Sequence, residues 1–129
     1  MRKISQYFIS LDAQRGRIKL KLTALKLGAD YALTLHGGRA HVGSTALAAP
    51  GQNAQICQIA GHRDGEIAAS VAERVANALQ VRVAVTCGIH YDAITREEIA
   101  QVRELAGQLA VKFTTTLGNG NRCGEAEIC

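Results

Sequence analysis

Residues 67–87, IAASVAERVANALQVRVAVTC, contain the change of hydrophobic period that decides the fold. As far as Leu79, large apolar residues recur at every fourth position, which is typical of a helix with one buried stripe. From Val81 to Cys87 the chain is apolar and rich in β-branched residues, which is typical of a well-covered strand. A helix followed at once by such a strand indicates a protein that contains both helices and strands.

The sequence before this stretch has the period of two that strands require. Residues 17–22, RIKLKL, alternate strictly between basic and aliphatic side chains. Similar short runs, separated by turn residues, predict further strands near residues 7–11, 31–35, 41–47 and 54–59. Because the intervening turns are short, we expect an antiparallel meander of strands.

A second helix is predicted after the buried strand. The segment TREE at 95–98 is a capping box, with Thr95 as the N-cap and Glu98 reaching back to it. After Phe113 the chain is rich in Thr, Gly and Asn, so we expect residues 114–129 to form a flexible tail. The order of elements predicts an α+β fold, a largely antiparallel sheet covered by two helices, in one domain over residues 1–129.

Composition and charge exclude several classes of function. Aromatic residues make up 4% of the chain and tryptophan is absent, so a stacking platform for bases is not expected. The net charge of +4 is modest, and its one cluster admits either a polyanion patch or the solvated face of a sheet. The cluster consists of Arg15, Arg17, Lys19, Lys21 and Lys26. Because no nucleic-acid motif accompanies it, we favour the solvated face and expect no nucleic-acid partner.

The chain is expected to be cytoplasmic. No apolar run approaches the roughly 18 residues of a membrane span, and the polar residues after Met1-Arg2-Lys3 argue against a secretory signal peptide. Its cysteines should therefore stay reduced. Cys57 and Cys87 lie in apolar runs and are expected to be buried thiols, whereas Cys123 and Cys129 give only a weak zinc signal in the polar tail.

Three histidines lie at similar structural places. His41 follows the glycine pair at 37–38, His62 precedes the first helix, and His90 follows the buried strand. We expect the loops that carry them to converge on one rim of the sheet, a rim that His36 can share. A metal site would combine the three imidazoles with Glu66 or Asp92.

The same loops contain groups that favour an anion. A glycine pair exposes backbone N–H groups, and the segment GHRDGE at 61–66 places Arg63 at a helix N-terminus. Asp64 and Glu66 oppose a phosphate unless Arg63 or a cation intervenes. We expect Asp64 mainly to cap the helix, while His62 and Glu66 face a ligand or a bridging cation.

The residues alone leave three explanations open for the histidines. They are hydrogen-bonding residues of turns, ligands of a metal, or parts of a ligand site that uses them for hydrogen bonding and proton transfer. No nucleophile–base pair can be identified, and the G-x-G-x-x-G and Walker patterns are absent.

Four motifs together resemble one family. They are GGRAHVG at 37–43, ALA at 46–48, GHRDGE at 61–66 and CGIHYDAITREEI at 87–99. In this order and spacing they resemble the LpdD-like family, the small accessory D subunit of gallate decarboxylase and related UbiD-type enzymes. The resemblance runs from about Tyr31 to Leu105.

The resemblance implies a prenylated-flavin chaperone. Such a protein receives prenylated FMN (or FMN) from a flavin prenyltransferase, and delivers or matures it for a UbiD-type decarboxylase of a gallate-like aromatic acid. It also implies a proteasome-assembly-chaperone-like fold, a homodimer, and a non-catalytic role, with assistance in oxidative maturation left open. The cofactor-binding positions carried over by motif, with Arg63 added as the neighbouring cation, are Gly37, Gly38, His41, His62, Arg63, Glu66, Gly88, His90 and Asp92.

Two residues depart from the family pattern. Gly65 stands where a larger polar residue is expected, and Tyr91 stands where a small aliphatic residue is expected. Tyr91 can stack on an isoalloxazine ring or fill a dimer surface. Two functions from other classes remain as alternatives: a dimeric protein-assembly chaperone without a small ligand, and a metal-dependent enzyme that uses the histidine cluster.

Overall fold

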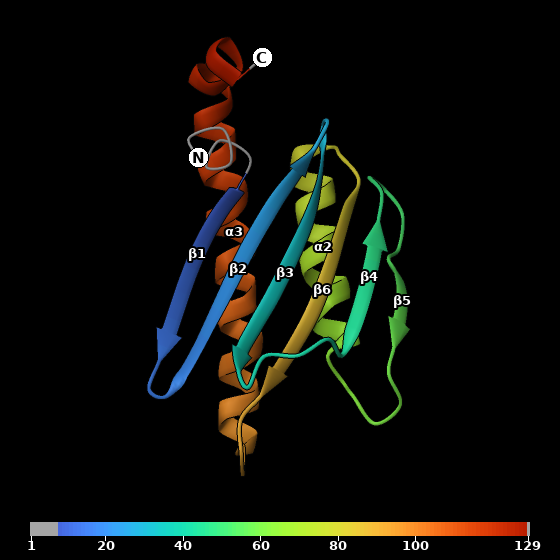
Figure 1. Cartoon of the computed structure of the whole chain (residues 1–129), viewed down its shortest axis with the longest axis vertical. Coiled ribbons are helices and arrows are strands. Elements are labelled where there is room, and N and C mark those ends of the chain that lie inside the picture. Colours follow the sequence, from blue (N-terminus) through green and yellow to red (C-terminus); the bar gives the residue numbers. More distant parts are fainter. Residues whose placement is uncertain (1–7, 129) are drawn as a thin grey trace.

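Within residues 8–128 the protein forms a single sheet of six strands with two helices packed on one face (Figure 1). The computed structural model describes residues 8–128, with side chains as far as Leu117. The predicted α+β class, with a mostly antiparallel sheet and two helices, is confirmed. The elements are β1 (Phe8–Arg15), β2 (Ile18–Leu27), β3 (Asp30–Gly38), β4 (Ser44–Ala48), β5 (Gln55–Gln58), α2 (Gly65–Leu79), β6 (Val83–His90) and α3 (Arg96–Ile128).

The position of β6 within the sheet was not predicted. The strand order is β1-β2-β3-β6-β4-β5, with β6 parallel to β3 and antiparallel to β4. The expected meander therefore holds from β1 to β3 and again for β4 and β5, but it is wrong between β3 and β4. Val83, Val85 and Cys87 of β6 are fully buried, so this strand is most stable in the middle of the sheet rather than at its edge.

The alternation in β2 has the physical cause that its sequence predicted. Ile18, Leu20 and Leu22 are at most 1% exposed beneath the helices, whereas Lys19 and Lys21 point to solvent on the open face. The interpretation of the basic cluster as a solvated sheet face is confirmed for Lys19 and Lys21, whereas Arg15 and Arg17 pair with glutamates of α3.

Two arginines beside this strand bind the sheet to α3. Arg15 forms an ion pair with Glu104, and Arg17 donates two hydrogen bonds of 2.8 and 2.9 Å to Glu98. Glu98 also completes the predicted capping box, because Thr95 N–H donates to its carboxylate while its own N–H donates to the Thr95 hydroxyl. The Arg17 hydrogen bond, followed by that from the Thr95 backbone, lowers the pKa of Glu98 to about 2.

Both helices use small or regularly spaced residues to cover the sheet. In α2, Ala68, Ala72 and Ala76 are fully buried, so the helix backbone lies close to the strands. In α3, buried Phe113 and Leu117 extend the apolar stripe, and the helix runs on to Ile128. The segment expected to be a tail after Phe113 is thus helical through Ile128, while its flexibility stays a prediction. Although α3 is long, no helix within residues 8–128 is apolar enough over its length to span a membrane.

The cysteines differ in their environments. Cys87 is fully buried as predicted, and burial, with a smaller effect of Asp64, raises the pKa of its thiol to about 12. Cys57 is exposed, so its predicted burial is wrong; β5 is a short edge strand in which all four residues are exposed. The predictions for Cys123 and Cys129 concern side chains outside those that the structure describes.

Tyr91 closes the sheet where β3 leaves β2. The β2–β3 register begins at the pair Leu20 and Gly37, because the chain turns away at Gly38, which has φ +64°. The Tyr91 hydroxyl accepts from Lys19 N–H and donates to Lys19 C=O, each at 2.8 Å, in place of a strand partner. A Cβ at position 37 would lie 2.5 Å from Leu20 Cδ2, 2.7 Å from Lys19 O and 3.1 Å from the Tyr91 hydroxyl, so glycine there leaves room for β2 and for Tyr91.

We expect Tyr91→Phe to lower the free energy of unfolding by about 1–3 kcal/mol, because two backbone groups of Lys19 lose their partner. Urea unfolding monitored by circular dichroism measures this change. Tyr31→Phe is the matched control, since the Tyr31 hydroxyl makes no hydrogen bond within the described residues. If Tyr91→Phe lost no more stability than Tyr31→Phe, the Tyr91 hydroxyl would not contribute to holding β2 in place.

Candidate functional site

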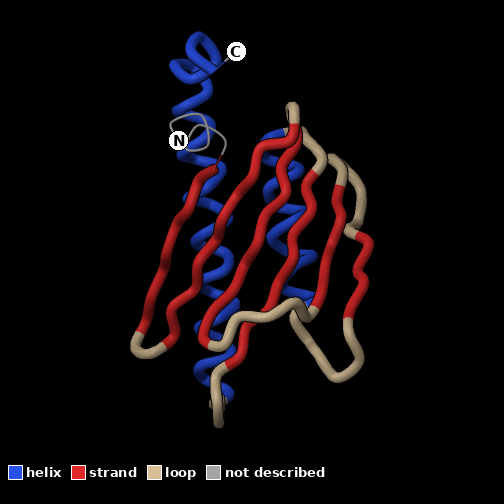
Figure 2. Tube along the Cα trace, in the orientation of Figure 1, coloured by secondary structure: helices blue, strands red, loops and turns tan. Residues whose placement is uncertain are grey.

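A cleft of about 670 Å³ lies at the edge of the sheet where the parallel strands β3 and β6 both end. The loops after β3, β5 and β6 gather at this edge, the lower one in Figure 2, as the three motifs led us to expect. In sheets with parallel strands, the space outside their carboxyl ends is the common place for a ligand. The cleft is lined by Arg39, Ala40, His41, Gly61, His62, Arg63, Asp64, Ile89, His90 and Ile94.

The first loop reaches the cleft by crossing over β6. Gly43 N–H donates to Cys87 C=O at 2.9 Å, which holds the end of the loop against the strand. A Cβ on Gly88 would overlap the backbone carbonyl of His41. The absence of a side chain at Gly88 is therefore required, because only glycine lets the loop pass close enough to β6 to place His41 in the cleft.

The second loop is attached to the first. Ile59 N–H donates to Gly43 C=O at 2.9 Å, and His62 N–H donates to Ile59 C=O at 3.0 Å. These bonds bring His62 beside His41, with ring centroids 5.0 Å apart and the rings tilted by 44°. Two of the three histidines thus meet although they are far apart along the chain.

Asp64 points into the cleft instead of capping the helix. It occupies the N-cap position of α2 but makes no side-chain capping bond, so its predicted role is wrong. Its Oδ2 accepts from Ile89 N–H at 3.4 Å and lies 3.6 Å from His41 Nε2. The side chain of Gln58 replaces it as a helix cap, accepting from Gly65 N–H at 3.0 Å. Sequence reasoning missed Asp64 as a site residue, because an aspartate before a helix is first interpreted as a cap.

The third loop contributes a more exposed group. His90 Nε2 lies 3.0 Å from Asp92 Oδ1, and Arg39 lies 3.5 Å from the same oxygen. The His90 hydrogen bond first, and then the charge of Arg39, lower the pKa of Asp92. His90 lines the cleft, whereas Asp92, which pairs with His90 and Arg39, does not line it and is 85% exposed.

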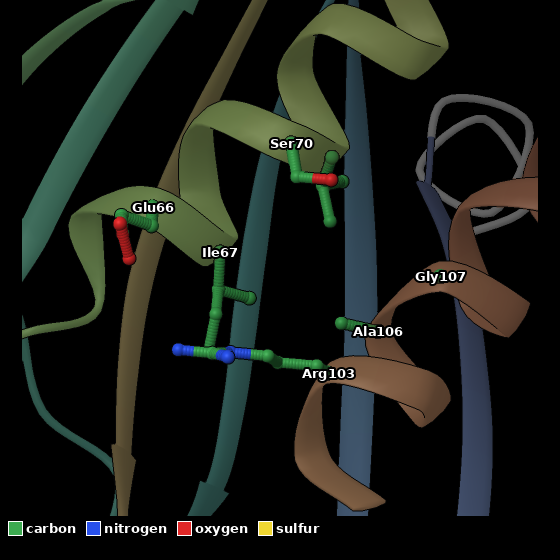
Figure 3. Close-up of a pocket in the computed structure, with 7 residues that line it drawn as sticks. Glu66, Ile67, Ser70, Arg103, Ala106 and Gly107 are labelled. Atoms are coloured by element: carbon green, nitrogen blue, oxygen red, sulfur yellow. The ribbon is translucent and has the colours of Figure 1, made fainter. Parts of the chain in front are cut away.

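Glu66 lies elsewhere. It borders a smaller cavity of about 130 Å³ between α2 and α3, where Figure 3 shows Ile67 pointing toward the end of the Arg103 side chain from the second helix. Glu66 comes four positions after His62, and the turn into the helix carries its side chain to a different face. The expectation that His62 and Glu66 face one ligand is therefore revised in favour of His62 and Asp64.

The glycine pair has a packing role. A Cβ on Gly38 would overlap the carbonyl of His90, and Arg39 N–H already donates to that carbonyl at 2.9 Å. The N–H of Gly65 at the start of α2 is likewise taken by Gln58. Neither of these two amides is free to hold an anion, and the arginines that line the cleft are Arg39 and Arg63. His36 lies within β3, opposite Gly88, and does not line the cleft.

We expect Gly88→Ala to lower the free energy of unfolding by at least about 1–3 kcal/mol, because the new methyl group must displace the His41 backbone. Gly107→Ala in α3 is the matched control. Its Cβ would come no closer than 3.8 Å to Arg74, so this change should stabilise the protein by about 0.5–1 kcal/mol. Denaturant unfolding of both variants measures the difference, and a stable Gly88→Ala protein would contradict the crossing that we describe.

Comparison with known proteins assigns the family. A family model described as the prenylated flavin chaperone LpdD-like domain matches residues 14–118. The chain belongs to this LpdD-like family. The match includes all three loops of the cleft, and so confirms the resemblance that their motifs suggested. A search of curated proteins gave no match.

The LpdD-like chain also shares its fold with a solved structure. It is similar to a chain of a chaperone complex for yeast 20S proteasome assembly, with a TM-score of 0.60 and 12% sequence identity. The alignment covers 86% of this chain and 98% of the other. At this identity the likeness shows the fold alone, and it confirms the predicted architecture.

Proposed function

We propose that this LpdD-like protein binds prenylated FMN, or FMN, in the cleft at the ends of β3 and β6. It would receive the flavin from a flavin prenyltransferase and hold it for delivery to, or maturation for, a UbiD-type decarboxylase of a gallate-like aromatic acid. The observation that carries the proposal is the convergence of three family motifs on one cleft of about 670 Å³. This volume lies within the range of roughly 300–1,000 Å³ that small-molecule sites occupy, whereas the 130 Å³ cavity between the helices is too small. A hollow of about 500 Å³ beside β5 and α2 also lies within this range, but Glu66 is the one motif residue that lines it.

The charges of the cleft suit a phosphate. Arg39 and Arg63 are exposed at its rim, and within residues 8–117 Arg63 makes no ion pair. Arginine presents several N–H donors to phosphate oxygens, and each such charged hydrogen bond contributes more than a neutral one. The pairing of Arg39 with Asp92 is exposed to water and therefore weak enough to exchange for a ligand.

The remaining lining suits a flat, partly polar ring. Ile89 and Ile94 supply apolar contacts, and the imidazoles of His41 and His62 supply polar ones. His41 Nε2 is buried without a hydrogen-bond partner, so a polar atom of a ligand placed there would satisfy it.

The proposed role is sequestration. The flavin supplies the chemistry of the decarboxylase, whereas the residues of this chain bind it, orient it and limit its contact with water. No nucleophile with an adjacent base lines the cleft, which fits a carrier better than a hydrolase or transferase. The homodimer and the cytoplasmic location that we expected from the sequence stay predictions.

We expect anaerobic titration with reduced prenylated FMN or with FMN to give a Kd below about 100 μM, roughly −5.5 kcal/mol. Arg63→Gln should weaken binding about tenfold, since a charged hydrogen bond contributes about 1.5–3 kcal/mol. Lys21→Gln removes an equal charge from the open face of β2 and should leave the affinity unchanged. If neither flavin binds with a Kd below about 100 μM, the cofactor proposal is refuted.

A partner-docking role without any small ligand is the second candidate, and exposed apolar residues beside the cleft favour it. Val42 and Ile59 are 68% and 58% exposed, and both adjoin Gly43 in the attached loops. Such an exposed apolar patch would suit contact with a larger partner protein, and this contact needs no ligand in the cleft.

The two candidates predict opposite results for paired substitutions. If the protein carries a flavin, His41→Ala with His90→Ala should abolish activation of the decarboxylase, and Val42→Asp with Ile59→Asp should reduce activation without changing flavin affinity. If it is a docking module alone, replacing the two histidines should leave activation of the decarboxylase unchanged. The assay mixes decarboxylase produced without its cofactor, reduced prenylated FMN and each variant.

A further inference from the structure

Three ligand-type atoms converge on one point beside Gly43. The donor atoms of His41, His62 and Asp64 all lie within 4.8 Å of one another, and all three residues are partly buried. A Cβ on Gly43 would lie 2.7 Å from Asp64 Oδ2, 3.1 Å from His62 Nδ1 and 3.2 Å from His41 Nε2. The absence of a side chain at this glycine leaves open the space that the three atoms share.

The hydrogen bonds of His41 prepare it as a ligand. Its Nδ1 lies 3.0 Å from the carbonyl oxygen of Arg39, which can only accept, so Nδ1 carries the proton. In the neutral ring, Nε2 then keeps its lone pair and points toward the cluster, where it is buried without a partner. Histidines that bind metals commonly donate their other ring N–H to a carbonyl in this way.

We propose that His41, His62 and Asp64 bind one divalent transition-metal ion of the zinc type, through His41 Nε2, His62 Nδ1 and Asp64 Oδ2. Atoms that ligate one ion at about 2.0–2.2 Å lie roughly 3–4 Å from each other in tetrahedral geometry. His41 Nε2 and Asp64 Oδ2, at 3.6 Å, already have this separation. Two imidazoles and one carboxylate form a donor set that suits zinc and other late divalent ions of the first row.

The position of the set gives the ion a use. Three protein ligands leave at least one coordination position free, as in zinc sites that bind a further ligand. Because all three residues line the cleft, that position would be accessible to an oxygen or nitrogen of a bound molecule. The set differs from the one considered from the sequence, since Asp64 replaces Glu66 or Asp92, and His90 is engaged with Asp92 instead.

The backbone holds the ligands without the ion. Ile89 N–H donates to Asp64 Oδ2 at 3.4 Å, which orients the carboxylate. The bonds through Gly43 that link the two loops fix the distance between the histidines. A site whose ligands are oriented in advance loses little conformational entropy when the ion binds.

The test is titration of the untagged full chain, stripped with a chelator, with Co²⁺ and then Zn²⁺. We expect one equivalent of Co²⁺ to bind with Kd below about 100 μM, roughly −5.5 kcal/mol, and to produce visible absorption bands that Zn²⁺ abolishes. His62→Ala and Asp64→Asn should each weaken binding at least about tenfold. The measurement contains no flavin, so its failure and the failure of the flavin proposal are separate results.

Gly43→Ala is the sharpest variant, because it keeps all three ligands and fills the space between them. Gly43 does not have a positive φ, so alanine adds volume without backbone strain. It should abolish the Co²⁺ bands in protein that thermal unfolding shows to be folded. His36→Ala, which removes a histidine outside the cleft, should bind as the unchanged chain does. Absence of one-equivalent binding, or equal binding by the Gly43→Ala, His62→Ala and Asp64→Asn proteins, would overturn the proposal.

Discussion

The structure depends on one constraint, the insertion of β6 between β3 and β4. Because β3 and β6 are parallel, both end at the same edge of the sheet, and the chain that leaves β3 must cross β6 to reach β4. The crossing loop is the one that carries His41, and it passes where Gly88 has no side chain to obstruct it. The buried strand thus determines both the core and the place of the cleft.

Glycines and one tyrosine convert this topology into a site. Gly37 and Gly38 leave room for Tyr91 and for the end of β6, so the third loop begins from a fixed position. Gly43 lies where the ligand-type atoms of the first two loops meet. Close packing explains why glycine occupies each of these positions, so the loops need no ligand to bring His41 and His62 together. A preorganised cleft of this kind lowers the entropic cost of binding a ligand.

Much of this was predictable from the sequence. Local patterns determine local structure, so three of them predicted the observed elements. These are the alternation in residues 17–22, the apolar residues at every fourth position of α2, and the Thr95 capping box. The neighbours of β6 were not predictable. Its apolar run indicates a central position in the sheet but does not specify which strands pair with it. For the same reason the motifs indicated that their loops meet, but not which side chains face one another. Asp64, expected as the cap, points into the cleft, whereas Glu66, expected at the ligand, borders the cavity between α2 and α3. The cap comes from Gln58 of β5, which no local pattern around the helix start could indicate.

The central claim is that the three loops at the ends of β3 and β6 form one ligand site. The most direct measurement is the change in amide and imidazole NMR shifts when reduced prenylated FMN, or FMN, is added to the labelled full chain. The account predicts that shifts change together in residues 39–43, 61–64 and 88–92, while those of the open sheet face around Lys21 and Thr34 stay constant. Shifts confined to the cavity between α2 and α3, around Ser70 and Arg103, would contradict it.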